Sequence, residues 1–316
     1  MAFTATDVKN LRETTGVGMM DCKKALTESD GDFDKAVLWL REKGLATAQK
    51  KAGRIAAEGI VAAIAEAGKP AGIVEVNIET DFAAKNETFQ KFGADLAAIV
   101  IDKDPKDLEA LLALDFPGEG KPVKDVLVDR VQVIGENIQI RRFERYEAGT
   151  NVSYVHMGGK IGVLIRLETD GIAADNAEVI TLGKDLAMQI AAMRPLYLDS
   201  SAVSEAAASE EEAVQKAKAL EELATDEKKK DLPADKKEAI AAGMVKGRMN
   251  KFFEDVCLAN QPFVKGEGET VAKHVENVAK AAGGTIKLTR FTRFEAGEGI
   301  EKKVDNFADE VASLVK

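Results

Sequence analysis

The feature that most constrains the fold is an internal duplication in the middle of the chain. EVNIETDFAAKN (75–86) resembles IRLETDGIAADN (165–176), and IQIRRFERYEAG (138–149) resembles IKLTRFTRFEAG (286–297). The first two stretches are 89 to 90 residues apart and the second two are 148 apart, so the second copy carries an insertion of 58 residues. The sequence therefore predicts a duplicated module in which the second copy is interrupted.

Each copy combines strand and helix patterns. Apolar and polar residues alternate over 74–79, which predicts a half-buried strand, and AGKPAG (67–72) predicts a hairpin turn from an earlier strand near 59–65. Helical spacing follows at Phe89, Phe92, Leu96 and Val100. A second helix is expected over about 122–135, before the strand IQIRRFERYE. Antiparallel strands with helices on one face predict an α+β fold.

The regions outside the duplication are predicted to be helical. The insertion is rich in Ala, Glu and Lys, and Pro233 divides it, so we expect two antiparallel helices with a solvated, mixed-charge surface. Three helices are expected near the N-terminus, the third with Asp32 as its N-cap. Apolar residues at helical spacing predict a final helix: Ile300, Val304, Phe307, Val311 and Leu314.

These patterns divide the chain into five parts. They are an N-terminal helical domain (1–54), core repeat 1 (55–149), core repeat 2 (150–198 and 258–299), an inserted helical hairpin (199–257) and a C-terminal helical module (300–316).

Charge and composition limit the classes of function. The formal net charge is -10, which argues against a nucleic-acid backbone as the main partner. Two distant cysteines offer no disulfide framework and fit a reducing compartment. The start of the chain has no signal-peptide pattern, and no stretch approaches the ~18 apolar residues of a membrane span. A cytoplasmic protein that does not enter a membrane is expected.

No strong catalytic, cofactor or metal motif is found. The histidines and cysteines show no metal-ligand spacing, so we predict no metal site. HMGGKIG (156–162) lacks the leading glycine and the Ser or Thr of a P-loop, and a hairpin turn explains it better. GVGMMD (16–21) lacks the third glycine of a dinucleotide fingerprint. No bound cofactor is therefore expected.

The segment that follows the strand of the first copy raises three alternatives. Glu79 and Asp81, two apart in a strand, would share a face and could serve acid/base chemistry, but Glu168 and Asp170 in the second copy favour a scaffold role. Phe82 has only a glycine at the matching position, which indicates a projecting anchor for a partner. Alternatively, Phe82 packs back on its own helix.

The N-terminal region offers another candidate surface. The pair Met19 and Met20 either fills the three-helix core or forms an adaptable recognition surface. The sequence pattern does not decide between the two.

Six motifs in order resemble the bacterial translation elongation factor Ts family, over nearly the whole chain. They are LRETTGVGMMDCKKAL (11–26), TDF (80–82), HMGGKIGVL (156–164), KGRMNKF (246–252), QPFV (261–264) and RFEAGEGIEKK (293–303). The resemblance implies a three-helix domain like a ubiquitin-associated domain, a duplicated α+β core, an inserted coiled coil and a C-terminal helical module. It also implies a guanine-nucleotide exchange factor for the GTPase elongation factor Tu, with no bond chemistry of its own.

The resemblance further implies roles for single residues. Thr80, Asp81, Phe82 and Ala83 would meet the GTPase domain near its Mg²⁺ site, displace the ion, promote GDP release and stabilise the nucleotide-free form until GTP binds. Further partner contacts would come from Arg12, Met19, Met20, His156, Gly158, Gly159 and Lys160. Two other readings remain open at this point: a scaffold or chaperone-like binder without effect on nucleotide, and an acid/base enzyme at Glu79 and Asp81.

Overall fold

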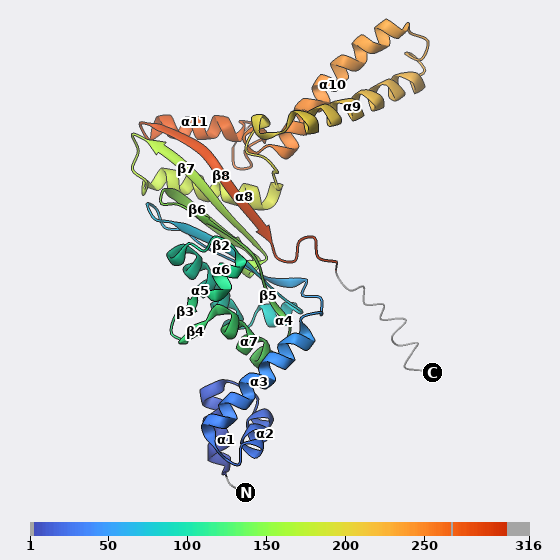
Figure 1. The fold of residues 1–316 in the computed structure, drawn as a ribbon. Helices are drawn as coiled ribbons and strands as arrows, with labels where there is room; N and C mark the ends of the chain where they lie inside the picture. Colours follow the sequence, from blue (N-terminus) through green and yellow to red (C-terminus); the bar gives the residue numbers. More distant parts are fainter. Residues whose placement is uncertain (1–2, 267, 302–316) are drawn as a thin grey trace, which may run out of the picture.

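The computed structural model describes residues 3–266 and 268–301. The chain forms a mixed α+β structure with antiparallel sheets, as the sequence predicts. Figure 1 shows an elongated molecule with three N-terminal helices at one end, two sheets in the middle and a helical hairpin at the other end. The helix predicted within 300–316 lies outside the described residues, apart from its first two positions.

Three helices with clear end signals form the N-terminal part. They are α1 (Ala5–Thr15), α2 (Met19–Glu28) and α3 (Phe33–Lys51). Helix α1 ends at Gly16, whose φ of 68° is left-handed. Asp32 accepts a hydrogen bond from the Lys35 amide, which confirms the predicted N-cap. The core of this part contains Leu11, Cys22 and Leu26 and is closed by α3.

Repeat 1 is a three-stranded sheet with helices on one face. Its elements are β1 (Glu58–Ile64), β2 (Ala71–Ile78), α4 (Asp81–Ala84), α5 (Glu87–Lys103), α6 (Leu108–Ala113), β3 (Asp115–Phe116), β4 (Lys121–Pro122), α7 (Val123–Ile134) and β5 (Ile138–Tyr146). The strand order is β1-β2-β5. The sequence patterns gave no separate signal for α4, α6 or the short β3–β4 pair.

Repeat 2 has the same plan with the strand order β6-β7-β8. Its elements are β6 (Thr150–His156), η1 (Met157–Gly159), β7 (Ile161–Asp170), α8 (Ala177–Met193), η2 (Ser200–Ala202), η3 (Leu258–Asn260), α11 (Val271–Ala281) and β8 (Thr285–Glu295). Helix α5 packs on β1 and β2 in repeat 1, and α8 packs on β6 and β7 in repeat 2. Asn86 and Asn176 cap these two helices in the same way.

The two sheets face each other, so the helices lie on the outside of a four-layer core (Figure 1). Between the sheets lies an apolar cluster: Val61, Ala71, Ile73, Tyr146, Leu164, Phe294 and Ala296. Each copy therefore uses one sheet face for its own helices and the other for its sister copy.

This arrangement overturns the prediction that the strand at 74–79 is half-buried. Every residue of β2 is buried, including Glu75 and Asn77 on the face that alternation assigned to solvent. The sister sheet covers that face. Glu75 is fully buried and accepts hydrogen bonds from Arg141 Nη1 at 3.0 Å, Arg142 Nε at 2.6 Å and the Gly297 amide at 2.9 Å.

The strand register also corrects the spacing between the copies. A β-bulge at Arg141 of β5 lies opposite Glu75 and Val76, and a β-bulge at Thr289 of β8 lies opposite Arg166 and Leu167. Matching the bulges puts equivalent strand residues 91 apart rather than 89, whereas β5 and β8 keep the spacing of 148. The Glu-Thr-Asp sequence of the second copy therefore lies inside β7, two positions earlier than the first copy's sequence.

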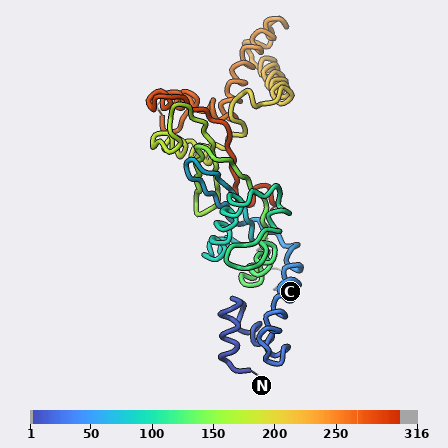
Figure 2. The backbone as a smooth tube through the Cα atoms, turned by 60° about the vertical axis from the view of Figure 1, so that its left-hand side comes forward, coloured from blue at the N-terminus to red at the C-terminus, as the bar shows by residue number. Residues whose placement is uncertain are grey.

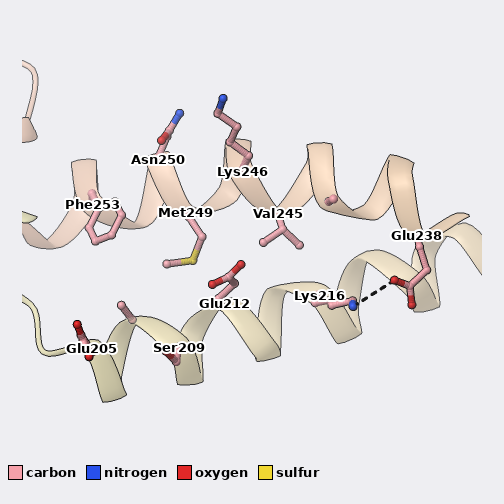
Figure 3. Close-up of a pocket in the computed structure, with 12 residues that line it drawn as sticks. Glu205, Ser209, Glu212, Lys216, Glu238, Val245, Lys246, Met249, Asn250 and Phe253 are labelled. Carbon is pink, nitrogen blue, oxygen red and sulfur yellow. Dashed lines mark hydrogen bonds and ion pairs between the residues drawn. The ribbon is translucent and has the colours of Figure 1, made fainter. Parts of the chain in front are cut away.

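The inserted hairpin consists of α9 (Glu205–Thr225) and α10 (Ala234–Val256), which project away from repeat 2 (Figures 1 and 2). Ala219, Leu223, Ala241 and Val245 form its apolar seam. Nearer the sheet the helices border a groove of about 600 Å³. Figure 3 shows its mixed lining, with Met249 of α10 lying toward Glu212 of α9.

None of the helices within the described residues combines the length and apolar character needed to cross a bilayer.

The buried position of Glu75 yields a stability prediction. Glu75→Ala leaves Arg141 and Arg142 without their buried partner, so we expect a loss of about 3 to 5 kcal/mol in the free energy of unfolding. Glu144→Ala is the matched control, because its ion pair with Arg290 also joins β5 to β8 but is more exposed. That control should lose less than about 1 kcal/mol in denaturant unfolding. Equal losses would contradict the assigned role of Glu75.

Candidate functional site

The segment after β2 presents an aromatic side chain to solvent. Thr80 caps the short helix α4 by accepting a hydrogen bond from the Ala83 amide at 3.2 Å. Phe82 follows in the first turn and is 82% exposed, the highest value among the large apolar side chains that the structure describes. Ala83 packs against the repeat 1 core, and Ala84 is buried. The prediction that Phe82 projects is confirmed, and packing back on its own helix is wrong.

Asp81 is held beside Phe82 by a local ion pair. Lys85 Nζ lies 2.7 Å from Asp81 Oδ2 and 5.8 Å from the centre of the Phe82 ring. The hydrogen bond from Lys85 holds the pKa of Asp81 below its usual value. Asp81 is therefore a carboxylate at neutral pH, suited to accept hydrogen bonds rather than to donate a proton.

Glu79 and Asp81 do not share a strand face, contrary to the prediction. Strand β2 ends at Ile78, so the two-residue period of a strand no longer applies at Asp81. Glu79 turns toward the loop after α7, where its Oε1 accepts a hydrogen bond from the Asn137 amide at 2.6 Å and lies 3.5 Å from Arg54 Nη1. The two carboxylates thus have separate structural partners.

The second predicted contact segment, His156 to Lys160, forms the turn between β6 and β7. Gly158 is exposed, and its φ of 64° is left-handed. Gly159 is buried, and a Cβ there would stand 2.9 Å from Ile60 Cβ of repeat 1. Lys160 Nζ binds Glu58 Oε2 at 3.2 Å, so Gly159 and Lys160 hold the turn against repeat 1. His156 Nδ1 pairs with the Tyr154 hydroxyl at 2.8 Å.

One side chain connects this turn with the Phe82 segment. Gln90 Nε2 donates to the Ala84 carbonyl at 2.7 Å and to the Gly158 carbonyl at 3.3 Å. Gln90 and Gly158 are 68 residues apart in sequence, and their hydrogen bond places the turn and the Phe82 segment on one side of the molecule. Met157, 75% exposed, adds a second apolar side chain there. Gln90 was not anticipated, because it belongs to no pattern that marks a surface. Met157 lies in the HMGGKIG turn, but its own exposure was not anticipated.

The predicted N-terminal residues lie on a separate surface. Arg12 is exposed, and Met19 and Met20 are 42% and 73% exposed, so the two methionines do not fill the three-helix core. Helix α3 separates this surface from α4 (Figure 1). Exposed Leu38 on α3 was not anticipated. The structure thus groups the predicted residues into two surfaces, one on α1–α2 and one around α4 and η1.

The remaining histidine and the cysteines have structural surroundings. His274 stacks on Phe263 with ring centres 3.9 Å apart and pairs with Glu269 Oε1 at 2.7 Å. Cys22 and Cys257 are buried, and burial raises the pKa of both thiols. Among the residues that the structure describes, no group of three or more His, Cys, Asp or Glu could hold a metal ion.

Comparison with known proteins shows what the chain as a whole is similar to. A family model described as "Elongation factor TS" matches residues 79–298. Elongation factor Ts of Syntrophotalea carbinolica is 45% identical over 318 residues, which cover all of both chains. Elongation factor Ts of Clostridium perfringens is 47% identical with 99% of each chain covered, and that of Paramagnetospirillum magneticum is 47% identical with 98% and 96% covered.

The exposure of Phe82 predicts that it contributes nothing to the core. Phe82→Ala should change the free energy of unfolding by no more than about 0.5 kcal/mol, as is usual for surface positions. Phe89→Ala, eleven residues from the end of β2 and fully buried in repeat 1, is the matched control and should cost about 3 to 5 kcal/mol. Denaturant unfolding measures both. Destabilisation of comparable size in the Phe82 variant would mean that its ring packs on the protein.

Proposed function

The chain belongs to the elongation factor Ts family, and from this premise we propose that it is a guanine-nucleotide exchange factor for elongation factor Tu in translation elongation. It binds the GDP form of that GTPase, promotes GDP release and stabilises the nucleotide-free form until GTP binds. It makes and breaks no covalent bond and acts in the cytoplasm. Binding of a nucleic acid is no part of the proposal.

The observation that carries the proposal is the exposed Phe82 on a fixed backbone. A partner that buries this ring removes apolar surface from water, and the capped backbone of α4 lowers the cost of ordering the segment on binding. Phe82 inserts between partner side chains near the Mg²⁺ site, and Asp81 and Thr80 supply polar contacts beside it. Ala83 supports the same turn from inside, since its side chain packs against the repeat 1 core.

Displacement of Mg²⁺ follows from this contact. The ion joins the nucleotide phosphates to the GTPase, so moving the residues that hold it weakens nucleotide binding. A protein that favours the nucleotide-free conformation of the GTPase lowers its affinity for GDP. GDP lowers the affinity of the GTPase for that protein by the same ratio. Asp81 is ionised at neutral pH and is paired with Lys85, so the segment brings a carboxylate and an ammonium group close to that site.

Contacts elsewhere supply the remaining affinity. Arg12, Met19 and Met20 touch the GTPase domain, and the turn with His156 and Gly158 touches the partner as well. Gly159 and Lys160 act mainly by holding that turn, because both are engaged with repeat 1. We also infer that α1–α3 are a domain of the ubiquitin-associated type and that α9 and α10 form a coiled coil around their apolar seam.

The proposal is tested by release of fluorescent GDP from purified bacterial elongation factor Tu with catalytic amounts of this protein. Phe82→Ala should reduce the acceleration about 30-fold, since truncation of an aromatic anchor costs ~2 kcal/mol or more. Val214→Ala, at an exposed apolar position on α9, is the matched control and should leave the acceleration unchanged.

Binding of the two proteins without any acceleration of GDP release by the wild type would refute the exchange function. It would instead favour the alternative of a scaffold that binds through the hairpin and the N-terminal helices. The acid/base alternative is disfavoured, because Glu79 is occupied by Asn137 and Arg54 and the pKa of Asp81 is lowered.

A further inference from the structure

The two repeats differ where their central strands end. With equivalent residues 91 apart in β2 and β7 and 148 apart in β5 and β8, Thr80 corresponds to Gly171 and Glu136 to Gly284. The residues before this last pair confirm the equivalence, since Gly135 and Gly283 have left-handed φ values of 85° and 82°. The pair Thr80 and Glu136 thus occupies a place where repeat 2 has two glycines.

In repeat 2 the two strands continue to pair up to this place. The β7–β8 ladder reaches Asp170 opposite Thr285, the equivalents of Glu79 and Asn137. Gly284 allows the close approach, because a Cβ there would stand 2.2 Å from the Asp170 carbonyl oxygen. Any side chain at this position would therefore push the strands apart.

In repeat 1 the ladder stops earlier, at Ile78 opposite Ile138, and two carboxylates take over its hydrogen bonds. The Asn137 amide donates to Glu79 Oε1 at 2.6 Å. The Thr80 amide donates to Glu136 Oε2 at 2.9 Å, and the Thr80 hydroxyl donates to Glu136 Oε1 at 2.7 Å. Hydrogen bonds to a carboxylate are stronger than those between neutral groups, so Glu136 fixes Thr80 firmly.

The orientation of Thr80 determines that of α4. Because its hydroxyl proton is directed to Glu136, the hydroxyl oxygen is free to accept the Ala83 amide and to cap the helix that bears Phe82. The chain of contacts runs from Glu136 through Thr80 to α4 and Phe82. Glu136 itself lies 54 residues from Phe82 in sequence, on the loop between α7 and β5.

We propose that Glu136 is the positioning residue of the exchange site. Glu136 ends the β2–β5 ladder and holds α4, so that Phe82 projects at a fixed angle. This inference rests on the proposed function. Its consequence is that Glu136 affects GDP release through α4, and chiefly through Phe82, without a contact of its own with the nucleotide site.

A double-mutant cycle tests this dependence. Glu136→Ala should reduce the acceleration of GDP release about tenfold in the wild-type background. It should have a much smaller effect in the Phe82→Ala background, where only the polar contacts of Thr80 and Asp81 remain to be disturbed. Glu136→Gln, which keeps one acceptor oxygen, should retain an intermediate rate. Asp95→Ala is the matched control, because it removes a carboxylate that pairs with Lys91 on α5 of the same repeat. It should leave the rate of GDP release unchanged in both backgrounds.

A reduction of the same size in both backgrounds would overturn the proposal, since Glu136 would then act independently of Phe82. Amide hydrogen exchange in the protein alone gives a second readout that needs no partner. Thr80 and Ala83 amides should exchange faster in Glu136→Ala, whereas core amides of β2 should not. Unchanged protection at Thr80 and Ala83 would also overturn the proposal.

The same measurements separate this proposal from the proposed function. If the wild-type protein does not accelerate GDP release, the exchange function fails, and amide exchange alone decides whether Glu136 holds α4. If Glu136→Ala does not fold, the comparison passes to Glu136→Gln, whose amide oxygen accepts only one of the two hydrogen bonds from Thr80.

Discussion

The architecture depends on the burial of both faces of β2. Because the module is duplicated, the sheet of repeat 2 covers the face of the repeat 1 sheet that its own helices leave open. The polar face of β2 is thereby removed from water. Glu75 is fully buried and needs compensation, which two arginines of β5 and the amide of Gly297 supply. Because Gly297 follows β8 of the other repeat, the buried carboxylate joins the two copies at a single point and fixes where the chain leaves the core.

The same duplication explains how one copy could acquire a projecting aromatic. Both copies have the same sheet and the same capped helix, so the fold does not need every hydrogen bond at the end of the strands. Repeat 2 keeps the ladder and places glycines at its end. Repeat 1 replaces the last backbone pairs with Glu79 and Glu136, and the released segment forms α4. At the end of the central strands, the divergence of the repeats is therefore local and electrostatic.

Much of the fold could be predicted from local patterns, and the failures have a common cause. The Asp32 cap and the 67–72 hairpin turn depend on nearby residues, so the sequence suffices. Phe82 is exposed as predicted, but the glycine that sequence similarity pairs with it lies at the position of Thr80 in the strand register. The burial of Glu75 depends on a surface from another part of the chain, which alternation does not encode. The alignment of the two Glu-Thr-Asp motifs was wrong, because sequence similarity matched residues that the bulges place two positions apart in the sheets.

The loop between α7 and β5 also connects the two contact surfaces. Asn137, the residue after Glu136, donates a hydrogen bond of 2.8 Å from Nδ2 to the carbonyl of Arg54, which follows the end of α3. Lys51 of α3 donates to the Gly135 carbonyl. Arg41 of α3 pairs with Asp125 of α7. Three consecutive residues thus hold both the end of α3, which carries the N-terminal surface, and the cap of α4. A partner that engages one surface meets the other already in place, so the second contact costs little additional ordering. This matters for an exchange factor. Binding free energy weakens the bound nucleotide only to the extent that it stabilises the nucleotide-free conformation of the partner, and free energy used to order the factor itself has no such effect.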